Sequence, residues 1–118
     1  MFGKVKVGNR ELELCANAAT AVRYRQVFRK NILSYFMGTE PAEESAAMVQ
    51  ELAYIMAKSA EKADMNKLSF EDYCEWLEGF EGLDFFPEET VQDIMAIYQG
   101  NEMPTEESKK KQDRPKEK

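Results

Sequence analysis

The segment from Asp64 to Glu75 comes closest to the spacing of a known chemical site. Its acidic and amide side chains, at Asp64, Asn66, Asp72 and Glu75, match four ligand positions of an EF-hand calcium loop. The position of that loop that must turn sharply and favours glycine is Ser69, and Ser69 is better explained as a helix cap. We therefore expect no calcium site in this segment.

Residue types that perform catalysis are sparse. The chain has no histidine, which removes the most common general base and metal ligand. The two cysteines, Cys15 and Cys74, do not form a CxxC pair, so we expect ordinary thiols. The neighbouring carboxylates Glu71-Asp72 and Glu88-Glu89 could act as acid and base, but they belong to nine acids without a pattern over 71–93, which is typical of a solvated surface. These features predict a non-catalytic protein without a metal or other cofactor.

Length and composition predict one domain with a core. The chain has 118 residues, of which 43% are hydrophobic, and its formal net charge is −6. An acidic chain disfavours nucleic acid as a generic partner. No apolar run approaches the roughly 18 residues that a membrane span requires, and residues 1–7 lack the apolar stretch of a secretory signal. The expected location is therefore the cytoplasm, without membrane association.

Charge is distributed unevenly along the chain. Residues 17–37 carry four bases and no acid, whereas residues 71–93 carry nine acids and no base. The basic residues, which alternate with Tyr24 and Phe28, allow three interpretations: a surface for single-stranded nucleic acid, solvated arginines beside core aromatics, or a basic surface that meets an acidic one. The acidic surface could belong to the same chain or to a second copy, and the latter would give head-to-tail assembly.

Residues 4–14 are expected to form a β-hairpin. Gly8 and Asn9 suit the two central positions of a tight turn, with glycine supplying positive φ. That register places lysines opposite glutamates on one face and Val5 opposite Leu12 on the other. An isolated hairpin is barely stable in water, so its apolar face must be covered by another element.

The rest of the pattern predicts about four helices. The first runs from an Asn17 cap to about Met37, and its apolar residues spread over more than one face, which suggests a central helix or a second contact surface. The others are expected from 39–41 to 62–64, from a Ser69 cap to Gly82, and from Pro87 to Gly100.

The predicted fold is therefore mainly α, with an N-terminal β-hairpin followed by about four helices in a small bundle over residues 1–100. Residues 101–118 have almost no large apolar side chain and many charges, so they are expected to form a disordered tail.

Four segments together resemble the tail assembly chaperones of long-tailed bacteriophages and prophages with non-contractile tails. These segments are KVGNRELEL at 6–14, AATAVRYRQVF at 18–28, ELAYIMAK at 51–58 and SFEDYCEWL at 69–77. The resemblance covers residues 4–98, in order, and includes no catalytic motif. It implies a largely α-helical protein that binds the tape-measure protein, helps to recruit tail-tube subunits, self-associates, acts in the host cytoplasm and is absent from the mature virion.

No residue-level binding motif comes with that resemblance, so exposure and charge select the candidate partner-binding residues. They are Arg23, Arg25, Phe28, Arg29, Phe36, Glu71, Glu75 and Glu78. Two other functions stay open: a small interaction or regulatory module of a mobile element, and a nucleic-acid-binding regulator that uses residues 17–37. Neither alternative requires an enzyme.

Overall fold

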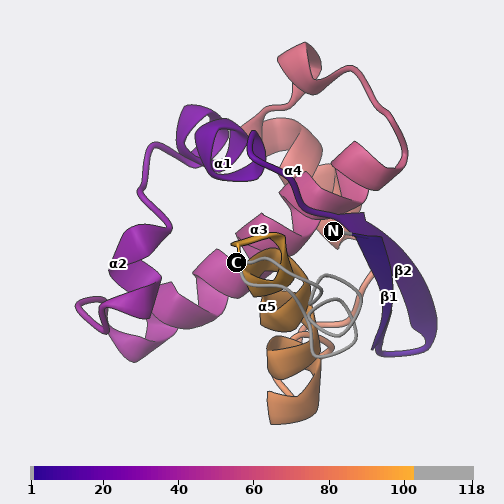
Figure 1. Ribbon diagram of the computed structural model, residues 1–118. Coiled ribbons are helices and arrows are strands. Elements are labelled where there is room, and N and C mark those ends of the chain that lie inside the picture. The colour runs from indigo at the N-terminus through magenta and orange to yellow at the C-terminus, as the bar shows by residue number, and fades with distance from the viewer. Residues whose placement is uncertain (1, 103–118) are drawn as a thin grey trace, which may run out of the picture.

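The computed structural model describes residues 2–102, in which an N-terminal β-hairpin is followed by helices (Figure 1). The elements are β1 (Phe2–Val7), β2 (Arg10–Cys15), α1 (Thr20–Phe28), α2 (Leu33–Phe36), α3 (Ala42–Ala60), the short 3-10 helix η1 (Met65–Lys67), α4 (Phe70–Leu77) and α5 (Glu88–Glu102). This confirms the mainly α prediction and the hairpin. Residues 2–102 contain five α-helices, one more than expected.

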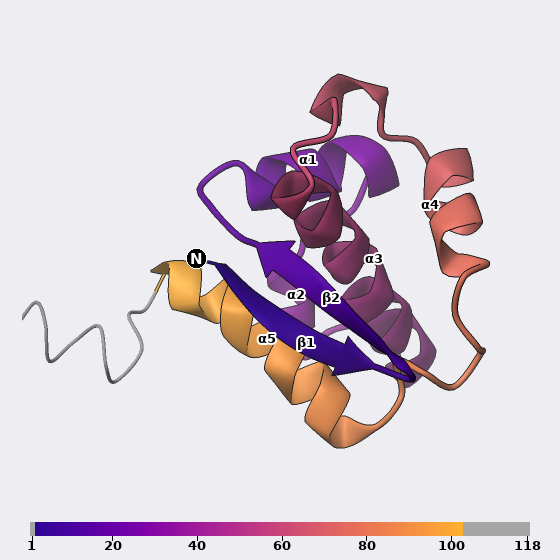
Figure 2. The same cartoon turned by 90° about the vertical axis from the view of Figure 1, so that its right-hand side faces the viewer.

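The hairpin has the register that the sequence predicts. Val5 lies opposite Leu12 and Lys6 opposite Glu11, and Gly8 opens the turn with a φ of 60°. The apolar face is buried because two helices cover it: β2 packs against α3, and β1 packs against α5 (Figure 2). Gly3 lets β1 approach α5 closely, since a Cβ at this position would lie 2.9 Å from the Ile97 side chain of α5.

The central helix is α3, so the first of the two alternatives for 17–37, a central helix or a second contact surface, was wrong. Every residue from Glu51 to Ala57 is buried, so α3 is covered on all sides in this stretch. β2, α1, α4 and α5 all pack against it. The small side chains of Ala53 and Ala57 let the neighbouring elements approach closely, which a count of large apolar residues does not detect.

The prediction of one continuous helix over 17–37 was also wrong. The Asn17 side chain accepts the N–H of Ala19, and α1 begins only at Thr20. α1 then ends at Phe28, because Arg29 adopts a left-handed conformation with a φ of 60°. After this break the Asn31 side chain accepts the N–H of Leu33 and α2 begins there.

The last two helices differ from prediction in where they end. The Ser69 hydroxyl accepts the N–H of Asp72, which confirms the predicted cap of α4. α4 ends at Leu77, earlier than the expected Gly82, because residues 78–86 form tight turns. α5 continues past Gly100 to Glu102, so the first two residues of the expected tail are helical. The rest of that tail lies outside the described residues.

Residues 2–102 contain no helix that is both long and apolar enough to cross a bilayer.

Candidate functional site

α1 presents its basic residues on more than one side. Thr20, Tyr24 and Phe28, at four-residue spacing, form the buried side of this helix. Arg25 and Arg29 are exposed on the outer side. Together with Val22 and Gln26 they line a shallow hollow of about 310 Å³. This surface, which we call the basic hollow, is the part of the predicted basic site that faces solvent.

The structure assigns internal roles to two of the predicted site residues. Phe28 is buried, with its ring centroid 4.9 Å from that of Tyr73, so it belongs to the core. Arg23 is half-buried, and its Nη1 donates to the Asn66 side chain at 3.2 Å. Arg23 therefore joins α1 to the connection between α3 and α4.

The predicted acidic residues of α4 lie together. Glu71, Glu75 and Glu78 are all exposed, and their spacing of four and three residues places them on one face of the helix. Asp72 points the other way and accepts a 2.6 Å hydrogen bond from the Tyr54 hydroxyl. Among residues 2–102, no ion pair joins the arginines of α1 to these carboxylates, so the two charged surfaces do not neutralise each other within the chain.

Phe36 belongs to an apolar surface on the short helix α2. The exposed fractions are 55% for Leu33, 39% for Phe36 and 66% for Met37. The Phe36 ring stacks on Tyr98 of α5 at a centroid distance of 5.9 Å, which holds α2 against the domain. Only Phe36 was selected from the sequence. Leu33 and Met37 become part of the surface because the break after Arg29 reorients α2 relative to α1.

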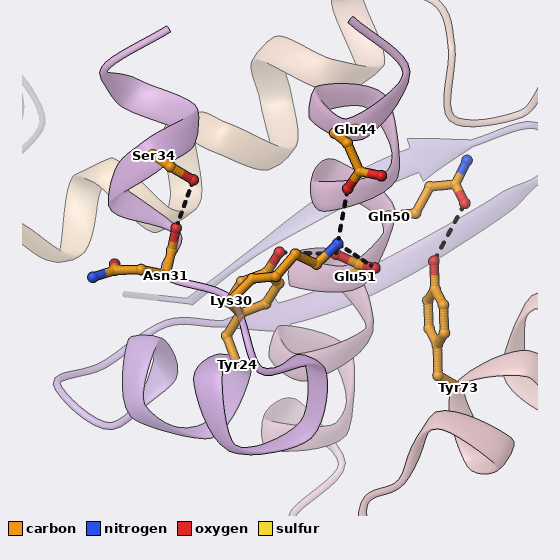
Figure 3. A network of polar contacts seen from close by, with 8 residues as sticks. All are labelled: Tyr24, Lys30, Asn31, Ser34, Glu44, Gln50, Glu51 and Tyr73. Atoms are coloured by element: carbon orange, nitrogen blue, oxygen red, sulfur yellow. Dashed lines mark hydrogen bonds and ion pairs between the residues drawn. The ribbon is translucent and has the colours of Figure 1, made fainter. Parts of the chain in front are cut away.

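A polar network fastens the segment after α1 to α3 (Figure 3). Glu51 is only 6% exposed, and its carboxylate accepts a 2.8 Å hydrogen bond from the Tyr24 hydroxyl. Lys30 lies 3.0 Å from the same carboxylate and 3.3 Å from Glu44. The buried negative charge is therefore paired and hydrogen-bonded, as burial requires. This network is structural, since its groups satisfy one another.

Burial raises the pKa of Tyr24 far above its usual value, and the Glu51 carboxylate that it binds raises this pKa further. Burial likewise raises the pKa of Tyr54, which donates to Asp72, and the pKa of Tyr73. Partial burial on its own would lower the pKa of Lys30, but its hydrogen bonds and charge interactions with Glu51 and Glu44 outweigh this effect and the pKa rises.

These shifts predict alkaline unfolding. In each case the folded chain holds its proton more tightly than the unfolded chain, so the stabilisation is complete below about pH 10 and is lost as the pH rises above it. Urea unfolding between about pH 9 and 12 should give a steadily falling free energy of unfolding. Phenolate absorbance should show at least three of the five tyrosines ionising only as the fold is lost. Independent, gradual ionisation of all five in the folded protein would contradict this assignment.

Two side chains within the segment that imitates a calcium loop, Asp64 and Ser69, serve as caps. Asp64 accepts the N–H of Asn66 and opens η1, while Ser69 caps α4. Within residues 2–102, no group of three or more cysteine, aspartate or glutamate side chains is arranged to hold a metal ion. The geometry of these residues supports a structural role.

A second exposed apolar pair went unnoticed in the sequence. Leu83 and Phe86, in the connection between α4 and α5, are 70% and 53% exposed. From the sequence, Phe85 and Phe86 could not be distinguished, but the turn buries Phe85 and exposes Phe86.

Comparisons with protein families, curated proteins and solved structures found no match. The function must be inferred from the surfaces of the chain itself. Its described residues offer a basic hollow on α1, an acidic face on α4 and exposed apolar side chains on α2 and before α5. Such surfaces suit contacts with other polypeptides.

Proposed function

We propose that this protein is a non-catalytic tail assembly chaperone of a long-tailed phage or prophage. In this role it binds the tape-measure protein in the host cytoplasm, helps to recruit tail-tube subunits and leaves before the virion is complete. Two things support the proposal: the resemblance over residues 4–98, and the exposed apolar surface that Leu33, Phe36 and Met37 form on α2. The α2 surface is the observation on which the proposal depends.

An exposed apolar helix suits a client rich in apolar helices. Fully burying one such side chain contributes roughly 1.5–3 kcal/mol, while association costs roughly 4–15 kcal/mol in lost freedom. Three side chains therefore supply weak, reversible binding, which a temporary chaperone needs if tube subunits are to displace it. The stacking of Phe36 on Tyr98 fixes the orientation of α2, so that less ordering is required when the client binds.

The direct test is co-expression with the tape-measure protein encoded by the same genome, followed by co-purification. The wild-type chain should retain the client in solution, and Leu33→Ser with Met37→Ser should release most of it. A matched control replaces Phe2 and Phe70 by serine, since these side chains are similarly exposed, at 57% and 61%, but lie on β1 and α4. If the wild-type chain fails to retain the tape-measure protein, the proposed function is wrong.

Self-association is part of the same proposal. We expect the basic hollow of one copy to dock on the Glu71, Glu75 and Glu78 face of the next, because neither surface is neutralised within the described chain. Arg25→Glu with Arg29→Glu should lower the average mass measured by sedimentation to that of smaller species. Lys62→Glu with Lys67→Glu changes the net charge equally at exposed positions elsewhere and should leave the mass distribution unchanged. An unaltered distribution for both pairs would exclude this interface.

A regulatory or adaptor module from a mobile element is the second candidate, since the same surfaces could bind a different protein. The genes around its coding sequence distinguish the two, because a chaperone requires tail genes nearby. Nucleic-acid binding is less well supported: Tyr24 and Phe28 are buried and cannot stack on bases. A salt-dependent mobility shift with DNA or RNA would reverse that assessment.

A further inference from the structure

The connection between α4 and α5, residues 78–87, is a compact series of turns that we call the acidic lobe. Two successive turns form it, with the Asp84 N–H donating to Glu81 at 3.1 Å and the Phe86 N–H donating to Leu83 at 3.1 Å. The Asp84 carboxylate also accepts the N–H of Glu81 at 2.9 Å. Internal hydrogen bonds therefore stabilise both turns of the lobe.

The hairpin turn holds this lobe in place. Arg10 donates to the Gly79 carbonyl at 3.0 Å, and its guanidinium lies 4.7 Å from the centroid of the Phe80 ring. Gly8 contacts Asp84 so closely that an added Cβ would lie 2.5 Å from its carboxylate. Within the lobe, the Phe85 ring packs against the Phe80 ring, with the two centroids 5.1 Å apart. The lobe is thus pre-organised before any partner arrives.

Two large apolar side chains of the acidic lobe, Leu83 and Phe86, take no part in these contacts. Leu83 and Phe86 are largely exposed, whereas the neighbouring Phe85 is buried. Leu83 also borders a hollow of about 400 Å³ between the lobe, the hairpin turn and the start of α5. The side chains around this hollow include Lys6, Leu83, Asp84, Pro87, Glu89 and Asp93.

The charge around the hollow is predominantly negative. Three carboxylates, at Asp84, Glu89 and Asp93, face one ammonium group at Lys6, and Lys6 lies opposite Glu11 in the hairpin. An occupant that brings apolar side chains and positive charges would bury Leu83 and pair with the carboxylates at the same time.

We propose that the acidic lobe is a docking surface for a cationic amphipathic helix of a partner polypeptide. An amphipathic helix places apolar residues at i, i+3, i+4 and i+7 along one stripe and lysine or arginine on the flanks. Its stripe would cover Leu83, Pro87 and Phe86, and its flanks would reach Glu89 and Asp93. The inference rests on the protein-binding role proposed above and gives the chemistry of a polypeptide segment that the protein binds.

Two occupants from this chain itself fit less well. Residues 103–118 are rich in lysine, but Met103 is their only large apolar residue, so they could pair with the carboxylates without covering the apolar pair. The basic hollow of a second copy offers one large apolar side chain, Val22, beside its two arginines. A helix with a full apolar stripe complements both properties of the lobe.

The test uses the full-length chain and a labelled synthetic helix of about 18 residues with leucines at the spacing above and lysines elsewhere. We expect saturable binding that weakens as salt rises.

Leu83→Ser with Phe86→Ser should weaken binding of the labelled helix roughly tenfold or more. Glu89→Gln with Asp93→Asn should weaken it several-fold and flatten the salt dependence. Glu13→Gln with Glu43→Gln, which remove the same charge at exposed sites elsewhere, should change it less than about twofold.

Thermal melts verify that each variant is folded, and three further results would overturn the inference. A glutamate-for-lysine version of the helix that binds equally well would show that charge does not select the occupant. If deleting residues 103–118 strengthens binding of the labelled helix tenfold, these residues are the occupant of the lobe. Self-association that disappears in the Leu83→Ser, Phe86→Ser variant, with helix binding intact, would identify a second copy.

The tape-measure experiment separates this inference from the proposed function. If the lobe variants bind the tape-measure protein normally but lose the lysine helix, the lobe serves a different cationic partner and both proposals stand. If the lobe variants still bind both the tape-measure protein and the lysine helix, the docking inference is wrong and the proposed function is unaffected. If the wild-type chain binds the lysine helix but no tape-measure protein, the proposed function fails and the docking surface remains.

Discussion

Replacing Tyr54 by alanine is expected to lower the free energy of unfolding by about 4 kcal/mol, a large part of the roughly 5–15 kcal/mol that stabilises a domain of this size. Tyr54 is fully buried on the central helix. Its ring contacts Phe28 of α1, with centroids 6.1 Å apart, and Trp76 of α4 at 5.7 Å. The truncation would therefore open a cavity where three helices meet. Urea unfolding followed by circular dichroism measures the loss.

Tyr54→Phe is the matched control because it keeps the ring and removes only the hydroxyl. That hydroxyl donates to the Asp72 carboxylate at 2.6 Å, and its loss should cost about 1–2 kcal/mol. The difference between the two variants then measures ring packing alone. Should Tyr54→Ala unfold within 1 kcal/mol of the wild type, α3 cannot have the central position described here.

Replacing Lys30 by methionine is expected to cost about 2–3 kcal/mol. The Glu51 carboxylate would stay buried with the Tyr24 hydroxyl but would lose its nearest positive charge, 3.0 Å away. The estimate is at the lower end for a broken buried pair because the Lys30 side chain is 30% exposed and water already weakens the interaction. Lys62→Met, at an exposed position, should change stability by less than about 0.5 kcal/mol.

A triple variant separates charge from packing. Lys30→Met, Glu51→Met and Tyr24→Phe together remove the lysine, the carboxylate and the hydroxyl, so no polar group of the trio stays buried without its partners. Apolar replacement of a complete buried network is often neutral, so the triple variant should regain most of the stability that Lys30→Met loses. A triple variant as unstable as the single one would mean that lysine packing, rather than charge, accounts for the loss.

Local signals in the sequence were sufficient for the hairpin and for the start of α4. Gly8 fixes the turn, and the paired charges and apolar residues on either side permit only one register. Ser69 is followed by acidic residues and an apolar stripe, which is a local cap signal, and its hydroxyl accepts the N–H of Asp72 as expected. Both features depend on residues within about ten positions of one another.

The break after Phe28 could not be predicted in the same way. No glycine or proline interrupts 17–37, and the left-handed residue at the break is Arg29, a type that rarely marks a helix end. The break is favoured by tertiary contacts: Lys30 binds Glu51 of α3, and Phe36 stacks on Tyr98 of α5. Both contacts join residues that are far apart in the sequence, so the local helix propensity of 17–37 does not reveal them.

The candidate surfaces were predicted in part. Glu71, Glu75 and Glu78 were selected as acidic residues at helical spacing, and the structure exposes all three on one face. Helical spacing could also have excluded Phe28, since it lies four residues after Tyr24 on the buried side of α1. The acidic lobe could not have been found, because the hollow beside Leu83 is lined in part by Gly8 of the hairpin turn, 75 positions earlier in the chain.

The packing of β1 on α5 has a consequence for synthesis on the ribosome. Residues 2–7 leave the ribosome long before the helix that covers them, residues 88–102, has been made. Until then Val5 and Val7, which are buried in the folded protein, are not packed against α5. The nascent chain therefore exposes an apolar hairpin face and is prone to aggregate. The domain can therefore close only after α5 has been made, and a transcript cut short before α5 would yield a chain that cannot finish folding.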